Sequence, residues 1–193
     1  MRRVCVFCGS HEGADPGFAA AARQLGELLV REGMGLVFGG GSVGLMGEVA
    51  DAVLARGGEA IGVIPQALKE RELGHASLPH LHVVGTMHER KAMMAALADG
   101  FVALPGGMGT LDEFCEIVTW AQLGIHAKPC GLLNVAGYWD GFLRFLDHSV
   151  AEGFVSAGHR AMILVDTDPE RLLAAMRAYA PPPVKRWVEQ DEL

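Results

Sequence analysis

Positive charge is scarce in this sequence. Lysine and arginine number 16 against 23 aspartates and glutamates, which gives a formal net charge of −7. The sequence contains no basic patch, so it would repel the phosphate backbone of DNA or RNA. Nucleic acid is therefore not expected as a partner. A small anion is still compatible with this charge, because backbone amides and one or two cations can hold one.

The sequence also lacks a long hydrophobic run. No segment approaches the length of a membrane-spanning helix. The apolar run that follows Arg2 and Arg3 stops at Gly9, which is too soon for a signal peptide. We therefore expect no membrane association and a cytoplasmic location.

Cysteine occurs at four positions, Cys5, Cys8, Cys115 and Cys130. Cys5 and Cys8 form a C-x-x-C inside an apolar, strand-like run, and residues three apart on a strand point to opposite faces. No second pair completes a zinc site. We interpret Cys5 and Cys8 as buried structural thiols in a reducing compartment.

Short apolar runs alternate with amphipathic, alanine-rich segments along the chain. This alternation predicts an α/β fold: a Rossmann-like, doubly wound parallel sheet with helices on both faces. A chain of 193 residues that is 50% hydrophobic suits a single domain, expected over 1–180 and followed by a Pro-rich tail, 181–193. The expected strands are 4–8, 35–38, 60–64, 81–84, 101–104, 130–134 and 161–165, the expected helices are 18–31, 45–55, 87–98, 111–123, 139–152 and 169–179, and 65–79 is a polar loop.

Two glycine-rich loops follow expected strands. Residues 39–44 match G-x-G-x-x-G, but they follow the second strand, and the next strand ends in Ile64 and Pro65 with no acid for a ribose. A tight turn that lets a ligand approach the backbone is favoured over a dinucleotide site.

The second loop, 105–113, follows a strand and opens a helix. Its glycines and the helix N-terminus favour a phosphate cradle, and Thr110 can add a hydroxyl hydrogen bond. It is not a Walker loop, because no lysine follows the glycines. Thr110 and Glu113 also fit a capping box, which needs no substrate. Spacing alone leaves the two interpretations open.

Two adjacent cations, Arg90 and Lys91, stand near the start of an expected helix, where they oppose the helix dipole. This placement after a strand favours a bound anion, while a solvated pair of charges is the alternative. His80 and His82 could share a strand face, but no third ligand is evident, so no metal is expected.

Taken together, these motifs resemble the LOG ("lonely guy") family, the cytokinin riboside 5′-monophosphate phosphoribohydrolases, which older labels call lysine decarboxylases. The family's hallmark P-G-G-x-G-T-x-x-E stands at 105–113. Further similar motifs in the same order are V-F-C-G-S at 6–10, G-G-G-S-V-G-L-M-G at 39–47, M-H-E-R-K at 87–91, T-W-A-Q-L-G-I-H at 119–126 and G-L-L-N at 131–134. The resemblance runs from about Val4 to about Met176.

The resemblance implies a catalytic pair, Arg90 and Glu113. Asp112 departs from the glutamate that is usual in the family. The segment 69–82 is expected to line the base pocket. The substrate-binding residues that the resemblance and the loops together suggest are Ser10, Gly41, Ser42, Glu72, Lys91, Gly106, Gly107, Met108, Gly109, Thr110, Leu111, Asp112 and Thr119.

The activity that the resemblance implies is hydrolysis of the N-glycosidic bond of a nucleoside 5′-monophosphate, without a metal or organic cofactor and in a homodimer. A general purine-monophosphate nucleosidase and a non-catalytic nucleotide or cofactor carrier are the alternatives. Lysine decarboxylation is disfavoured, because pyridoxal phosphate needs a Schiff-base lysine and none of Lys69, Lys91, Lys128 and Lys185 has a convincing context for one.

Overall fold

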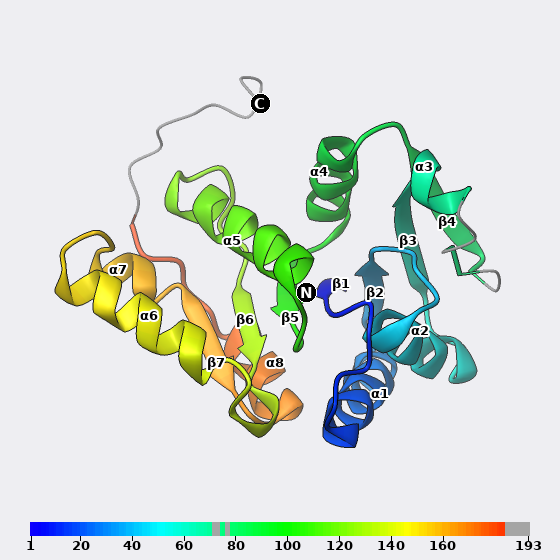
Figure 1. The fold of residues 1–193 in the computed structure, drawn as a ribbon, viewed down its shortest axis with the longest axis horizontal. Coiled ribbons are helices and arrows are strands. Elements are labelled where there is room, and N and C mark those ends of the chain that lie inside the picture. Colours follow the sequence, from blue (N-terminus) through cyan, green and yellow to red (C-terminus); the bar gives the residue numbers. More distant parts are fainter. Residues whose placement is uncertain (71–73, 76–77, 184–193) are drawn as a thin grey trace.

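The computed structural model describes residues 1–70, 74–75 and 78–183. They form a seven-stranded sheet in the order β4-β3-β2-β1-β5-β6-β7 (Figure 1). Every pair of neighbouring strands is parallel, which confirms the predicted doubly wound sheet. The strands are β1 (Arg3–Phe7), β2 (Gly35–Phe38), β3 (Ala60–Pro65), β4 (His80–Val84), β5 (Gly100–Ala103), β6 (Cys130–Leu133) and β7 (Ile163–Asp166).

Helices cover both faces of the sheet, as the sequence predicted. One hydrophobic cluster joins the sheet to α1, α2 and α8, and a second joins it to α4, α5 and α6. The helices are α1 (Pro16–Arg31), α2 (Gly44–Ala55), α3 (Gln66–Lys69), α4 (Met87–Leu97), α5 (Met108–Gln122), α6 (Asp140–Ala151), α7 (Ala157–Arg160) and α8 (Pro169–Arg177), with a 3-10 turn, η1 (Val135–Gly137).

Successive residues of β1 show how the strand pattern builds two cores. Val4 and Val6 belong to the first cluster, whereas Cys5 and Phe7 belong to the second, because side chains alternate across a strand. Cys8 returns to the first cluster, so the two cysteines of the C-x-x-C are buried on opposite faces. The prediction of buried thiols is confirmed for this pair.

The order of strands reverses between β1 and β5. From β1 the chain moves outward through β2 and β3 to β4, and it then returns to the other side of β1 as β5. The loops after these two central strands leave the sheet in opposite directions, which opens a space beyond their carboxyl ends. The fold therefore brings the segments around residues 9–13 and 105–110 together.

Some expected boundaries are wrong. The expected loop 65–79 contains the short helix α3, and the expected strand 161–165 begins only at Ile163, because residues 161 and 162 form a turn between α7 and β7. Ser156 starts α7 by accepting a hydrogen bond from the His159 amide at 3.0 Å. Residues 181–183 are the last described, so the rest of the predicted tail lies outside the described residues. No helix in the described part of the chain is long and apolar enough to cross a membrane.

Candidate active site

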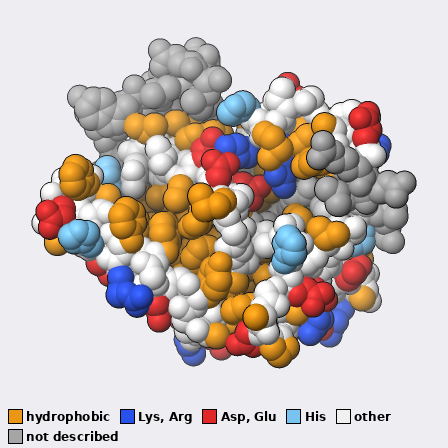
Figure 2. Space-filling view, in the orientation of Figure 1, with side chains coloured by type: hydrophobic (Ala, Val, Ile, Leu, Met, Phe, Trp, Pro, Cys, Tyr) orange, Lys and Arg blue, Asp and Glu red, His pale blue; other side chains and the backbone are white. Residues whose placement is uncertain are grey.

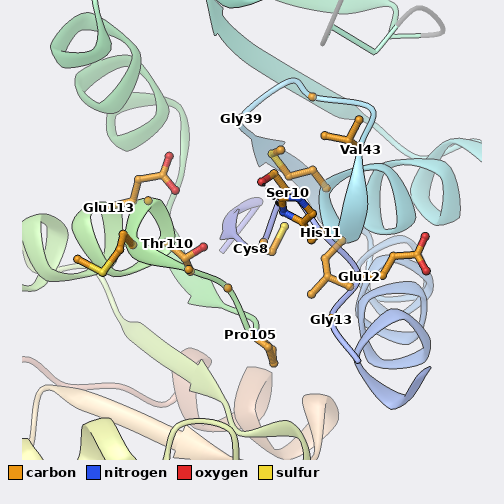
Figure 3. A pocket seen from close by; sticks show the side chains of 18 of the residues that line it. Cys8, Ser10, His11, Glu12, Gly13, Gly39, Val43, Pro105, Thr110 and Glu113 are labelled. Atoms are coloured by element: carbon orange, nitrogen blue, oxygen red, sulfur yellow. Dashed lines mark hydrogen bonds between the residues drawn. The ribbon is translucent and has the colours of Figure 1, made fainter. Parts of the chain in front are cut away.

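A cleft of about 560 Å³ lies at the reversal point of the sheet. Its walls are the loop after β1, the glycine loop after β2 and the loop that leads from β5 into α5. Figure 3 shows Glu113 and Thr110 of α5 on one side, with Ser10 and His11 across the cleft from them. The predicted location of the site beyond the carboxyl ends of the strands matches this cavity.

Arg90 of α4 and Glu113 of α5 form an ion pair in this cleft. Arg90 Nη1 lies 3.0 Å from Glu113 Oε1, and each residue is only 9% exposed. Arg90 Nε also donates a hydrogen bond of 3.1 Å to the carbonyl of Val63 near the end of β3. The guanidinium is therefore held by two different elements, and both charged groups line the cavity.

The Glu113 carboxylate is removed from water. Burial raises its pKa above the ordinary value, and the nearby Arg90 guanidinium offsets part of this rise. A carboxylate that is poorly hydrated and paired with one cation can interact strongly with a positive charge that develops nearby. This is the chemistry that a glycosidic bond cleavage requires.

The first glycine loop makes room for Arg90. A Cβ added at Gly39 would collide with Arg90 Nη2. Gly44 has a φ of +57°, and a Cβ there would collide with the backbone of Ser10 and His11. These two glycines are required by packing within the protein. Gly41 lines the cleft, whereas Ser42 is not part of its lining.

The second glycine loop presents free amides to the cleft. Helix α5 begins at Met108, with Gly107 as its N-cap and no side chain that caps it. The amides in the first turn of a helix have no partner within the helix, so those of Met108, Gly109 and Thr110 are available to an anion. Gly106 to Thr110 all line the cavity. The geometry suits the phosphate cradle that the sequence predicted.

The capping-box interpretation of Thr110 and Glu113 is wrong. Thr110 is the third residue of α5 rather than its N-cap, and Glu113 faces Arg90. A capping box occurs instead at the start of α4, which the sequence analysis missed although its T-x-x-E pattern was visible. There Glu89 N donates to Thr86 Oγ1 at 3.1 Å, and Thr86 N donates to Glu89 Oε2 at 3.3 Å.

Lys91 does not reach the cleft. Its ammonium donates hydrogen bonds to Glu116 at 3.0 Å and to Asp112 at 3.2 Å, both on α5. Burial lowers the pKa of Lys91, but the two carboxylates outweigh burial and the pKa is raised. Both cations are buried, so the alternative of a solvated pair is wrong. Lys91 holds α4 against α5, beside the Arg90–Glu113 pair.

Of the remaining predicted site residues, some line the cleft and others lie outside it. Ser10 lines the cleft, whereas Leu111 and Asp112 are outside its lining. Thr119 is exposed on α5, where its hydroxyl donates to the Cys115 carbonyl at 2.7 Å. Glu72 lies outside the described residues.

Other residues of the cleft wall were not among the predicted site residues, and they include Cys8, His11, Phe18 and Tyr138. Cys8 and His11 follow β1, so their position after a central strand was a usable signal. Phe18 belongs to α1 and Tyr138 precedes α6, and no sequence motif that we identified connects them to the glycine loops. Tertiary packing alone brings them to the site.

The fold and the cleft together define a Rossmann-like protein with a cavity of about 560 Å³, a glycine loop at the start of a helix and a buried Arg–Glu pair. Residues 46–176 match a family model described as "Possible lysine decarboxylase". The chain belongs to this family, the LOG family that the sequence motifs indicated.

Curated relatives are similar over most of the chain. "Probable cytokinin riboside 5'-monophosphate phosphoribohydrolase LOGL5" of Oryza sativa subsp. japonica is 53% identical over 95% of this chain and 74% of its own length. "Cytokinin riboside 5'-monophosphate phosphoribohydrolase LOG7" of Arabidopsis thaliana is 49% identical over 94% of this chain and 83% of its own length.

Solved structures share the fold at low identity. The molybdenum cofactor binding protein of Rippkaea orientalis has a TM-score of 0.69 and 22% identity, covering 92% of this chain and 96% of that one. A molybdenum cofactor carrier protein of Chlamydomonas reinhardtii has a TM-score of 0.69 and 21% identity over the same shares of the two chains. At this identity the likeness shows the fold alone.

Proposed function

We propose that this protein hydrolyses the N-glycosidic bond of N6-modified adenosine 5′-monophosphates, the cytokinin riboside monophosphates, to free base and ribose 5-phosphate. The observation that carries the proposal is the buried Arg90–Glu113 pair in the same cleft as the first-turn amides of α5, those of Met108–Thr110. The names of relatives that are 49–53% identical support it.

The geometry suggests a role for each group. The 5′-phosphate binds the amides at the start of α5, which directs the ribose towards Glu113. As the bond to the base breaks, positive charge develops on the ribose, and the Glu113 carboxylate stabilises it, activates water or attacks C1′ directly. Arg90 keeps Glu113 ionised and oriented. Water supplies the hydroxyl that joins C1′ and the proton that the leaving base takes up.

The other predicted contacts are proposed with different roles. Ser10 and Gly41 line the cavity and would contact the nucleotide directly, and Ser42 lies beside Gly41 in the same loop. Lys91 and Asp112 would act indirectly, by joining α4 to α5. Leu111 and Glu72 remain proposed contacts of the nucleotide, and this proposal rests on the resemblance to the family alone.

Thr119 fits a homodimer. Its exposed position on α5 is separate from the cleft of its own chain, so it would contact a nucleotide only from a second copy. Hydrophobic side chains gather over α5 and α6 in Figure 2, and Phe145 of α6 is 62% exposed. This apolar face supports a dimer.

The proposed location is the cytoplasm. All four cysteines are free thiols, which is typical of proteins in a reducing compartment.

The experiment that tests the function compares AMP with N6-isopentenyl-AMP as substrates of the purified protein, with free base as the readout. Base release from the prenylated nucleotide at least as fast as from AMP supports the proposal. Release from AMP alone leaves a general purine-monophosphate nucleosidase. Binding of both nucleotides without release of base would overturn hydrolysis and favour a carrier.

The decarboxylase label of the family model finds no support in the cleft. None of the lysines in the described part of the chain lines the cavity. Lys91 is bonded to Asp112 and Glu116, and Lys128 donates to the carbonyl of Ala95 at 2.7 Å. Lys69 is exposed on α3, and Lys185 lies outside the described residues. A Schiff-base lysine would need to face the cavity.

A further inference from the structure

We infer that Tyr138 is a positioning residue for the phosphate loop: its hydroxyl fixes the Gly106 peptide and thereby aims the amides that receive the 5′-phosphate. This inference rests on the proposed function only in the identity of the phosphate-bearing ligand. It adds a residue from the connection between β6 and α6 to a loop that was recognised by its own sequence motif.

The Tyr138 hydroxyl donates a hydrogen bond of 2.6 Å to the Gly106 carbonyl. This uses the one hydrogen of the phenol, so the hydroxyl cannot also donate to a phosphate. In a trans peptide the carbonyl and the next N–H point in opposite directions. Fixing the Gly106 carbonyl towards Tyr138 therefore turns the Gly107 N–H away from it.

The neighbouring carbonyl of the loop is fixed in the same way. Gly9 N donates to the Pro105 carbonyl at 3.0 Å, which joins the loop after β1 to the loop after β5. A Cβ at Gly106 would collide with the Thr110 hydroxyl and would lie 2.8 Å from Gly9 N. Gly106 is thus enclosed by Gly9, Thr110 and Tyr138. With both carbonyls held by donors of the protein, the amides that follow have a defined direction.

The segment that presents Tyr138 is itself rigidly built. Asn134 Oδ1 accepts from Trp139 N at 2.8 Å, and Asn134 Nδ2 donates to Asp140 Oδ1 at 2.8 Å. Between these anchors, Ala136 has a φ of 50° and Gly137 a φ of 71°. A left-handed alanine is strained and persists where its surroundings impose it, often at functional sites. The turn holds Tyr138 in one place.

The ring of Tyr138 is packed on two sides. It makes edge contacts with Phe18, at a centroid distance of 5.7 Å, and with Trp139, at 5.0 Å. A phenylalanine at this position would keep these ring contacts and would lack only the hydroxyl. Tyr138→Phe therefore isolates the hydrogen bond to Gly106, and Tyr179→Phe, which changes the other tyrosine of the chain outside the cleft, is the matched control.

The test measures binding by calorimetry for ribose 5-phosphate and for adenine, in the wild type and both variants. We expect Tyr138→Phe to weaken ribose 5-phosphate about tenfold, the scale of one lost hydrogen bond, and to leave adenine within twofold. The KM for AMP should rise more than kcat falls. Tyr179→Phe should match the wild type in every measurement.

Two results would overturn the inference. Unchanged ribose 5-phosphate affinity in Tyr138→Phe means that the hydrogen bond does not orient the loop. Equal weakening of ribose 5-phosphate and adenine means a general structural effect or a contact with the base. The binding measurement does not depend on turnover. If the wild type binds ribose 5-phosphate but releases no base from a nucleotide, the proposed function is wrong, and the effect of Tyr138→Phe on binding still tests this inference.

Discussion

Arg90 and Glu113 face each other from two different helices, with 3.0 Å between Nη1 and Oε1. Such a pair adds little net stability when it is buried, because the loss of hydration offsets the attraction between the charges. A buried pair that lines a cleft is therefore better explained by chemistry than by stability. Its geometry leads directly to the first prediction.

Replacing Glu113 with glutamine should abolish turnover and keep the fold. Glutamine has nearly the same shape and can still accept a hydrogen bond from Arg90, but it carries no charge to stabilise the ribose. We expect kcat to fall by about a thousandfold or more. Base release measures kcat, and thermal unfolding followed by circular dichroism measures the fold.

The matched control is Glu59→Gln. Glu59 also pairs with an arginine, since its Oε2 lies 2.8 Å from Arg3 Nε, but this pair stands away from the cleft. Its loss should leave kcat unchanged. If Glu113→Gln kept activity within tenfold of the wild type while folded, another group would have to perform the chemistry.

The pH dependence follows from the raised pKa of Glu113. The proposed chemistry needs the carboxylate, so kcat/KM should fall on the acidic side with a midpoint above the ordinary glutamate value of 4.5. Arg90 lowers this pKa, so in Arg90→Gln the midpoint of the residual activity should move to higher pH. A midpoint at or below 4.5 in the wild type would contradict the assignment of Glu113 to this step.

The raised pKa of Glu113 also determines how the stability of the protein depends on pH. Because the pKa is raised in the folded state, the contribution of Glu113 is fully present below its unfolded pKa and is lost as pH rises through the folded value. The free energy of unfolding of the wild type should therefore fall relative to Glu113→Gln across that window. Urea unfolding at a series of pH values measures it, and parallel curves for the two proteins would contradict the shift.

The sheet could be predicted because its signal is local. Val4 and Cys5 face opposite cores, so a central strand such as β1 is apolar on both sides and stands out between amphipathic helices. The position of the site followed as well, because parallel strands end at one edge.

What could not be predicted depends on which residues meet in space. The loop 39–44 was interpreted as a turn that lets a ligand approach the backbone, and Gly39 does line the cleft. The pattern did not show that Gly39 also makes room for the guanidinium of Arg90, which comes from a helix later in the chain. The spacing of Thr110 and Glu113 fitted an N-terminal capping box. The helix begins earlier, at Met108, with Gly107 as its N-cap in an extended backbone conformation. Tyr138 carries no motif that links it to Gly106.

A further prediction concerns Gly39. In Gly39→Ala the new Cβ would displace the Arg90 guanidinium, because the backbone directly after the buried strand β2 cannot move aside easily. We expect a loss of kcat by at least about tenfold, together with a smaller drop in melting temperature. Gly141→Ala is the control, since a Cβ on that glycine of α6 would meet no atom closer than 3.9 Å. Wild-type kcat in Gly39→Ala would show that Arg90 can work from a displaced position.

Another prediction separates the role of Lys91 from that of Arg90. Lys91→Met removes the cation that joins α4 to Asp112 and Glu116 and leaves the two carboxylates to repel each other. Because Asp112 is mostly exposed, solvent limits the effect, and we expect the free energy of unfolding to fall by about 1–2 kcal/mol in urea. Lys69→Met, which changes an exposed lysine of α3, should stay within about 0.5 kcal/mol of the wild type.

The kinetic effects of the two cations should differ in kind. Arg90 lines the cavity and touches Glu113, so Arg90→Met should reduce kcat strongly. The Lys91 ammonium faces α5 rather than the cavity, so Lys91→Met should change the KM for AMP by less than about threefold, with the loss seen mainly in stability. A large rise in KM with unchanged stability would instead mean that Lys91 turns from Asp112 and Glu116 to the phosphate when the nucleotide binds.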